Sequence, residues 1–443
     1  MTGDLDAAAR VGRDLVATAI RHGDRCTWIG PVVDPARPGA ALARPVGPAL
    51  YDGCAGIGLV LAELAACTGD GAFRDTAAAA LRAASDAADG TGLGLHTGSP
   101  GVALALVRGG ALIRDEALVA AGRRLAAGCD AVPHGPCQDV IGGRAGGVLA
   151  LLAIGDPVSV ATAERLADAM VAEVRRRGAW EWPADRESLL PTGVSHGATG
   201  VAHALYEVAA ATGRGDLAAA AGEAVRAERG HFDPVAGNWP RATAEDNARD
   251  HGGSEVSQVH WCHGAPGVAQ MRHRVWRRTG DEALRAEAAL ALATTARWTR
   301  GALAAGRGAW CLCHGLPGNA EILWECADAA GPDEAAGHVA LAREVADAGI
   351  AEHVEGGLPW PGGLAGGDPG PGLMIGLAGV ARFLLRLARP DLPSLLLPGG
   401  LGWATVAGQS SPNSVLSASV SSRVVRSAAR SSAASSDPQV VQG

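Results

Sequence analysis

The stretch "WCHGAPGVAQ", residues 261–270, is echoed by "CLCHGLPGNAEIL", residues 311–323. Each contains Cys-His-Gly, two further residues and a second glycine, and each then continues into text typical of a helix. Glycine has no Cβ, so two glycines three residues apart allow a helix start to approach another backbone closely. The two stretches therefore predict a helix-start motif that recurs along the chain.

The motif of a glycine, two residues, a second glycine and a helical run occurs seven times. Successive leading glycines are 45 to 67 residues apart, which leaves room for two helices and their loops in each repeat. One G-x-x-G is weak evidence, but seven copies that each open a helical run predict a repeat architecture. The leading glycines are Gly53, Gly98, Gly143, Gly197, Gly264, Gly315 and Gly376.

Two kinds of helix alternate within these repeats. The runs after the motifs are apolar nearly all round, and "IGLVLAELAAC", residues 57–67, has a single charge at Glu63. The stretches between the motifs, such as residues 115–128, have one charged face. Helices that are apolar all round are buried, whereas those with one charged face lie outside. Each repeat is therefore predicted to supply one inner and one outer helix.

Such helix pairs could extend into an open solenoid or close into a ring. The glycines favour a ring, because they allow the inner helix starts to converge at one mouth. We therefore predict an all-α fold, a double-layered α/α toroid of about seven helical-hairpin repeats over residues 1–403. The Ser-rich residues 404–443 are predicted to be a disordered tail.

Composition narrows the function. The 443 residues carry a net charge of −8 with no basic block in the predicted toroid, which gives nucleic-acid binding no electrostatic support. No apolar run of about 18 residues suggests a transmembrane helix. The first residues lack the basic start and apolar core of a signal peptide, which favours the cytoplasm. The nine cysteines are odd in number, and in this setting a disulfide framework is not expected.

The residues directly before the leading glycines carry the chemistry. Three consecutive repeats place a histidine there, and two of these histidines follow a cysteine. In a ring the two Cys-His pairs would be neighbours, and two thiolates with an imidazole suit zinc. The alternative is that both pairs are repeat echoes packed in the core. The three histidines and these two cysteines are His196, Cys262, His263, Cys313 and His314.

With these motifs the chain resembles the lanthionine synthetase C (LanC) family. The seven G-x-x-G repeats, "WCHGAPG" and "CHGLPGN" extend the resemblance over roughly residues 5–403. It implies an α/α toroid with one zinc ion. It also implies a lanthionine or methyllanthionine cyclase, which adds cysteine thiolates to dehydroalanine or dehydrobutyrine in a dehydrated precursor peptide. A separate dehydratase is the implied partner, because this chain is too short to include the dehydratase half of the two-domain synthetases.

By the same resemblance Cys262, Cys313 and His314 would be the zinc ligands. His196, in "SHG", would be the acid/base histidine, and Asp139, in "QDVIGG", would orient it or act as the acid. Michael addition needs a thiolate and then a proton for the enolate carbon, and histidine titrates near neutral pH. Which of the two residues is acid or base stays open at this level.

Two positions depart from the nisin-type members. Gln258 stands where those members have an arginine, and His263 stands where they have a tyrosine. Arg241 or another base could replace the missing charge. His263 is either a second acid/base group, and so a further catalytic candidate, or a partner that supports the zinc ligands.

Two other functions fit a toroid of this kind. One is a non-catalytic LanC-like protein that binds thiol peptides or glutathione. The other is a different α/α-toroid enzyme, such as a prenyltransferase-like protein, which an aromatic content of 4% disfavours. The zinc ligands together with Asp139 and His196 favour the cyclase.

Overall fold

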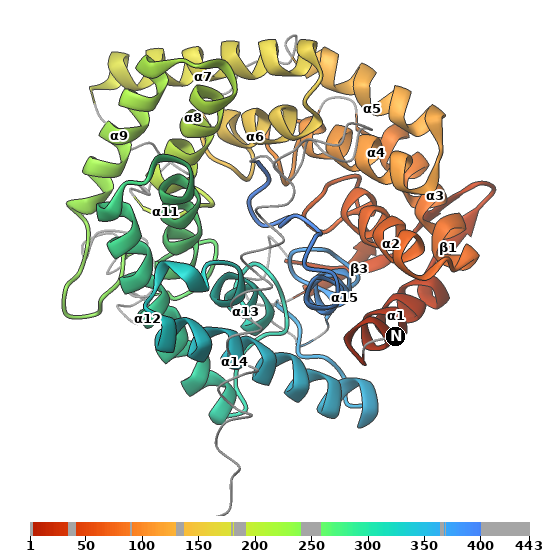
Figure 1. Cartoon of the computed structure of the whole chain (residues 1–443). Helices are drawn as coiled ribbons and strands as arrows, with labels where there is room; N and C mark the ends of the chain where they lie inside the picture. The colour runs from red at the N-terminus through yellow and green to blue at the C-terminus, as the bar shows by residue number, and fades with distance from the viewer. Residues whose placement is uncertain are drawn as a thin grey trace, which may run out of the picture.

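The computed structural model describes residues 3–33, 41–88, 91–129, 137–178, 180, 192–240, 258–363, 367 and 369–399. This part of the chain contains fourteen α-helices, which form two concentric layers around a central axis (Figure 1). The predicted double-layered α/α toroid is therefore confirmed. The predicted tail, residues 404–443, lies outside the described residues, and so does Arg241.

The inner layer consists of the helices that follow the seven glycine motifs. They are apolar nearly all round, as in the second inner helix, where residues 99–106 are all buried. Neighbouring inner helices pack against one another, and the last packs against the first, which closes the ring. These helices are α2 (Cys54–Thr68), α4 (Ser99–Ile113), α6 (Arg144–Ile154), α8 (Ala198–Thr212), α11 (Ala265–Thr279), α13 (Leu316–Glu325) and α15 (Leu377–Ala388).

The outer layer consists of the amphipathic helices between the motifs. Each packs against the inner helix that precedes it in the chain. The first helix, α1 (Gly3–Thr18), packs against α15, so the two ends of the fold together complete the seventh pair (Figure 1). The other outer helices are α3 (Gly71–Asp86), α5 (Glu116–Gly128), α7 (Pro157–Arg177), α9 (Gly215–Arg229), α12 (Glu282–Ala304) and α14 (Pro332–Gly349).

Two small antiparallel hairpins between α1 and α2 were not expected. They pair β1 (Ile20–His22) with β2 (Arg25–Thr27), and β3 (Ile29–Val33) with β4 (Ala41–Pro45). Their strands have three to five residues and little alternation of polar and apolar side chains, so they leave a weak signal in the sequence. Within the described residues, no helix is both long and apolar enough to cross a membrane.

A closed ring of backbone hydrogen bonds joins the seven repeats at the mouth, the end of the toroid where the inner helices begin. In each repeat the residue two before the leading glycine donates its N–H to the carbonyl of the corresponding residue in the next repeat. The seven N···O distances lie between 2.7 and 3.4 Å. The donors, in order around the ring, are Tyr51, His96, Ile141, Ser195, Cys262, Cys313 and Met374, and Met374 donates back to Tyr51.

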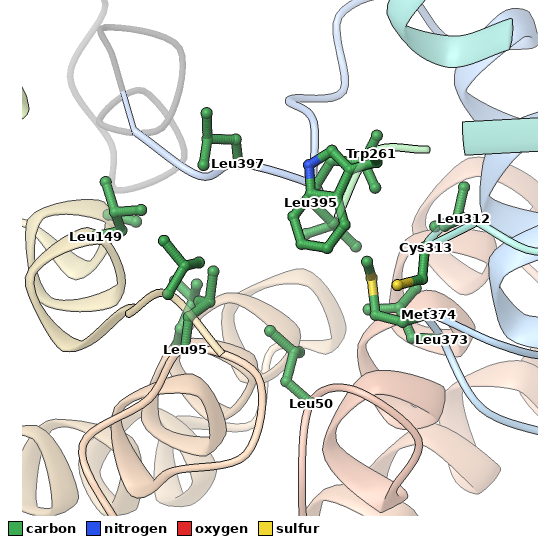
Figure 2. Close-up of a cluster of buried hydrophobic side chains, with 14 of the residues drawn as sticks. Leu50, Leu95, Leu149, Trp261, Leu312, Cys313, Leu373, Met374, Leu395 and Leu397 are labelled. Atoms are coloured by element: carbon green, nitrogen blue, oxygen red, sulfur yellow. The ribbon is translucent and has the colours of Figure 1, made fainter. Parts of the chain in front are cut away.

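This ring sorts the side chains of each repeat by position. The residues three before the leading glycines are at most 1% exposed and form the apolar floor under the mouth. Figure 2 shows five of them, Leu50, Leu95, Trp261, Leu312 and Leu373, within one buried cluster. The residues one before the leading glycines include the half-buried His196 and His314. The repeat thus separates positions that build the core from positions available for chemistry.

Both glycines of the motif are required by close backbone contacts. A Cβ on Gly101, the second glycine of its repeat, would lie 1.7 Å from the Leu95 carbonyl oxygen, and one on Gly318 would lie 1.9 Å from that of Leu312. Of the leading glycines, Gly264 also has a φ of 95°, which side chains rarely adopt. The expectation that these glycines serve close packing and tight turns is confirmed.

After α15 the chain turns into the centre of the toroid. Leu395, Leu396 and Leu397 are at most 2% exposed, and Leu395 and Leu397 lie in the cluster beneath the mouth (Figure 2). Charged side chains of inner helices hold this segment. Arg386 Nε donates to Leu392 O over 3.1 Å, and Ser394 Oγ donates to Glu321 Oε1 over 2.7 Å. The segment therefore fills the centre of the inner layer.

Candidate metal centre and acid–base pair

The loops before α11 and α13 bring three ligand atoms together. Cys262 and Cys313 are adjacent members of the backbone ring, and the Cys262 N–H donates to Cys313 O over 3.3 Å. The Sγ atoms of both cysteines and a ring nitrogen of His314 all lie within 4.8 Å of one another. The structure therefore unites the three predicted zinc ligands, although they come from segments about fifty residues apart.

The orientation of His314 suits metal binding. Its Nε2–H donates to the carbonyl oxygen of Gly363 over 2.5 Å. A carbonyl can only accept, so Nε2 carries a proton and Nδ1 is the ring nitrogen that can bind a metal in place of a proton. Metal-bound histidines commonly have their second ring nitrogen fixed in this way. Gly363 has no side chain to mark it in the sequence, and it lies in a Gly/Pro-rich loop, so sequence reasoning missed it.

The electrostatics of the three groups favour a cation among them. A hydrogen bond from the Cys313 thiol to Cys262, and then burial, raise the pKa of Cys313 well above its ordinary value. Burial lowers the pKa of His314, but hydrogen bonds to Cys311 and Cys313 outweigh it and raise this pKa to about 11. Both shifts follow from the close approach of the sulfur atoms, which disfavours a second thiolate at Cys313 and favours positive charge at His314. A divalent cation would supply such positive charge, and two thiolates with one imidazole fit zinc.

Tyr51 adds a hydroxyl group to this centre. Its side chain is hydrogen-bonded to Cys313, and burial together with that neighbour raises its pKa. Tyr51 occupies the same position in the first repeat that Cys262 and Cys313 occupy in theirs. Aligning the repeats two residues before the leading glycine identifies Tyr51, whereas the position one before that glycine holds Asp52 in this repeat.

The predicted pair of Asp139 and His196 is also formed. His196 Nδ1 donates to Asp139 Oδ2 over 2.5 Å, while Asp139 Oδ1 accepts the N–H groups of Gly142 and Gly143 over 2.8 and 2.9 Å. Burial raises the pKa of Asp139, but the bonds to His196 and to the backbone outweigh it and hold the pKa below its ordinary value. Asp139 is therefore an ionised carboxylate that fixes the His196 tautomer and leaves Nε2 as its free acceptor.

His263 lies between the Asp139–His196 pair and the loop that carries Cys262. Its ring stacks on that of His196, with centroids 5.8 Å apart and planes 26° apart. Ser195 Oγ donates to Cys262 O over 2.9 Å, so it accepts a hydrogen bond from His263 Nε2 over 3.3 Å. His263 is 6% exposed. These contacts join His263 both to His196 and to the segment that carries Cys262.

Asn238 fixes the loop that carries Cys262. Its Nδ2 donates to Gln258 O over 2.9 Å, and its Oδ1 accepts the N–H of Ala265, the first residue of α11, over 2.7 Å. Sequence reasoning missed Asn238, because it precedes the ligand by 24 residues in a stretch without repeat character. It acts as a bracket between the loop and the start of the helix.

Comparison with known proteins gives two findings. The family model described as "Lanthionine synthetase C-like protein" matches residues 44–397. A solved structure titled "Nisin cyclase" superposes with a TM-score of 0.57 and 17% sequence identity, covering 77% of this chain and 89% of that chain. The structural likeness bears on the fold, and the family match includes the residues of the candidate metal centre and of the Asp139–His196 pair.

Proposed function

The chain belongs to the lanthionine synthetase C-like family, and from that premise we propose that it is a zinc-dependent lanthionine or methyllanthionine cyclase. Its substrate would be a precursor peptide with a cysteine and a dehydroalanine or dehydrobutyrine. Such a dehydro residue arises when a serine or threonine loses water, so a separate dehydratase would supply the substrate. The observation that carries the proposal is the metal-ligand set beside the Asp139–His196 pair.

The metal would be held by Cys262, Cys313 and His314. When bound, zinc would lower the pKa of the substrate cysteine, and because Zn²⁺ with two thiolates and a neutral imidazole has no net charge, that sulfur would stay electron-rich. Tyr51 would keep Cys313 in place through its hydroxyl group. Gly363 O would keep Nδ1 of His314 directed at the metal.

The proton transfers fall to His196. Its Nε2 would accept the thiol proton of the substrate cysteine, and Asp139 would stabilise the resulting imidazolium through Nδ1–H. The thiolate sulfur then bonds to Cβ of the dehydro residue, and the C=C electrons pass toward the carbonyl as an enolate. Nε2 returns the proton to Cα, so the thiol proton becomes the new C–H. Asp139 acts as the orienting group, because its ionised carboxylate has no proton to give.

The acid–base pair distinguishes this function from thiol binding alone. A protein that only bound thiol peptides or glutathione would need the ligand set but no oriented imidazole beside it. Here the carboxylate of Asp139 accepts three hydrogen bonds to hold one histidine in one tautomer. That arrangement supports catalysis.

The experiment compares the wild type with Cys313→Ala and His196→Ala. Zinc per chain is measured first, and each protein is then incubated with a dehydrated, cysteine-containing peptide. Free thiols are counted by alkylation and mass spectrometry. We expect the wild type to bind zinc and to consume free thiols. Cys313→Ala should do neither, and His196→Ala should bind zinc but consume no thiols. Bound zinc with no thiol loss in the wild type, across a panel of such peptides, would leave thiol binding as the function.

A further inference from the structure

Three aromatic side chains outside the ligand set form a compact cluster, here called the aromatic clamp: Trp310, His353 and Trp360. Their ring centroids are 5.3 Å apart for Trp310 and His353, 5.1 Å for the two tryptophans, and 4.4 Å for His353 and Trp360. Each of the three residues is at most 9% exposed. The clamp is thus a buried contact among three segments of the chain.

One segment is a π-helical turn, η3 (Ile350–Glu355), that continues from α14 and supplies His353. π-Helical turns are rare and are often found at functional sites. Two hydrogen bonds join this turn to Leu358, a few residues further along the chain. The Leu358 N–H donates to Glu352 O over 3.2 Å, and His353 Nδ1 donates to Leu358 O over 3.2 Å. The segment 358–363 therefore leaves the helix in a defined direction.

The other two segments are the loops at the metal centre. Trp360 belongs to the segment that ends at Gly363, whose carbonyl fixes His314. Trp310 directly precedes the ligand loop, and its N–H donates to Pro361 O over 2.9 Å. A Cβ on Gly363 would lie 3.0 Å from Cys311 Sγ and 3.1 Å from His314 Nε2, so the two loops are in close contact.

The clamp packs on bare backbone at Gly349, the last residue of α14. A Cβ there would lie 2.4 and 2.5 Å from two ring atoms of Trp310, and 3.2 Å from Trp360. A single methyl group at this position must therefore displace the clamp. In the middle of the same helix, Gly337 has no neighbouring atom within 4 Å of such a Cβ, which provides a matched control.

We infer that the aromatic clamp positions His314 for metal binding, by holding the Gly363 carbonyl against Nε2. The inference rests on the proposed metal centre and names positioning residues for it, none of which contacts the metal. Partners that orient a ligating histidine commonly change metal affinity by about 10- to 100-fold when they are altered. A clamp that served packing alone would change stability and leave the metal affinity as it was.

The test measures two dissociation constants, that of Zn²⁺ by chelator competition and that of Co²⁺ by absorption spectroscopy. The absorption bands of bound Co²⁺ report sulfur and nitrogen ligands. The full chain is compared with Gly349→Ala, Trp360→Phe and the control Gly337→Ala. We expect both clamp variants to bind each metal about tenfold more weakly, with altered Co²⁺ bands, while Gly337→Ala matches the wild type. Circular dichroism and a thermal midpoint establish that each variant is folded.

The outcomes separate this inference from the proposed function. If the wild type binds neither metal, the proposed metal centre is wrong. If the wild type binds metal and folded Gly349→Ala and Trp360→Phe bind it equally well, the clamp has no positioning role. If Gly349→Ala does not fold, the milder Trp360→Phe decides alone, because it keeps an apolar ring at the position.

Discussion

His263 and His314 occupy the same position in neighbouring repeats, and each directly follows a cysteine. Their surroundings nevertheless differ. His314 donates its Nε2–H to Gly363 O, which leaves Nδ1 for a metal, whereas His263 Nε2 is bonded to Ser195 Oγ. The sequence predicted two Cys-His pairs at one mouth, and resemblance to the family selected the ligand among them. The physical reason for the difference lies in the partner loops, which no repeat pattern encodes.

At the same scale, the role of Asp139 can be separated from that of the metal. Asp139→Asn would replace one carboxylate oxygen with an NH₂ group. With this donor facing His196 Nδ1, the imidazole would lose its fixed tautomer. We expect the cyclisation rate to fall by about 10²- to 10⁴-fold, the usual contribution of a general acid–base group. Zinc content should stay at the wild-type level, because Asp139 is not a ligand. Single-turnover thiol loss and metal analysis on the same sample provide the measurement. Unchanged turnover would mean that Asp139 has only a structural role.

At the scale of the element, the inner helix start is the unit that the sequence repeats. Its two glycines, its apolar residue three before and its variable residues one and two before all follow one register. This is why seven inner helices and their order could be predicted from the sequence. The hairpins β1–β2 and β3–β4 and the π-turn η3 could not, because they depend on contacts with other elements and repeat nowhere. The supporting residues Asn238 and Gly363 could not be predicted for the same reason.

The register makes a testable claim about Gly101 in α4. Glycine to alanine inside a helix ordinarily stabilises it by up to about 1 kcal/mol. At Gly101 the added Cβ would lie 1.7 Å from Leu95 O, so the helix must move away from the mouth. We expect Gly101→Ala to lower the free energy of unfolding by about 1–3 kcal/mol, as overpacking does. Gly337→Ala, which meets no neighbouring atom, should match or exceed the wild type. Urea unfolding compares the three proteins, and a stabilised Gly101→Ala would contradict the close-packing account.

At the scale of the whole molecule, the first and last described segments of the chain close the toroid. Helix α1 completes the outer layer against α15, and the segment after α15 enters the centre. Partly buried ion pairs hold this closure together, since Arg386 and Arg274 both bind Glu325, and Arg274 also donates to Leu397 O. The sequence predicted a buried helix with Glu63 as the single charge in residues 57–67; the structure pairs this carboxylate with Arg108 and Arg382. Both partners lie on other inner helices, so they cannot be identified from this helix alone.

These ion pairs predict how stability depends on pH. Burial raises the pKa of Glu325, but Arg274 and Arg386 outweigh it and hold the pKa well below its ordinary value. A carboxyl group with a lowered folded-state pKa adds stability above its unfolded pKa of about 4.3, and this stability is lost as the pH falls toward the folded value.

The measurement of this pH dependence compares the wild type with Glu325→Gln. At pH 7 the substitution leaves two arginines without their carboxylate, and we expect it to cost about 3–5 kcal/mol of unfolding free energy. The gap between the two proteins should begin to narrow below about pH 4.5 and should persist at pH 2, because the wild-type carboxylate stays partly ionised there. Glu282→Gln, at an exposed pair with Arg285, is the control and should change little at any pH. Urea midpoints from pH 7 to pH 2 provide the test, and a gap independent of pH would show that Glu325 does not stabilise the closure through its charge.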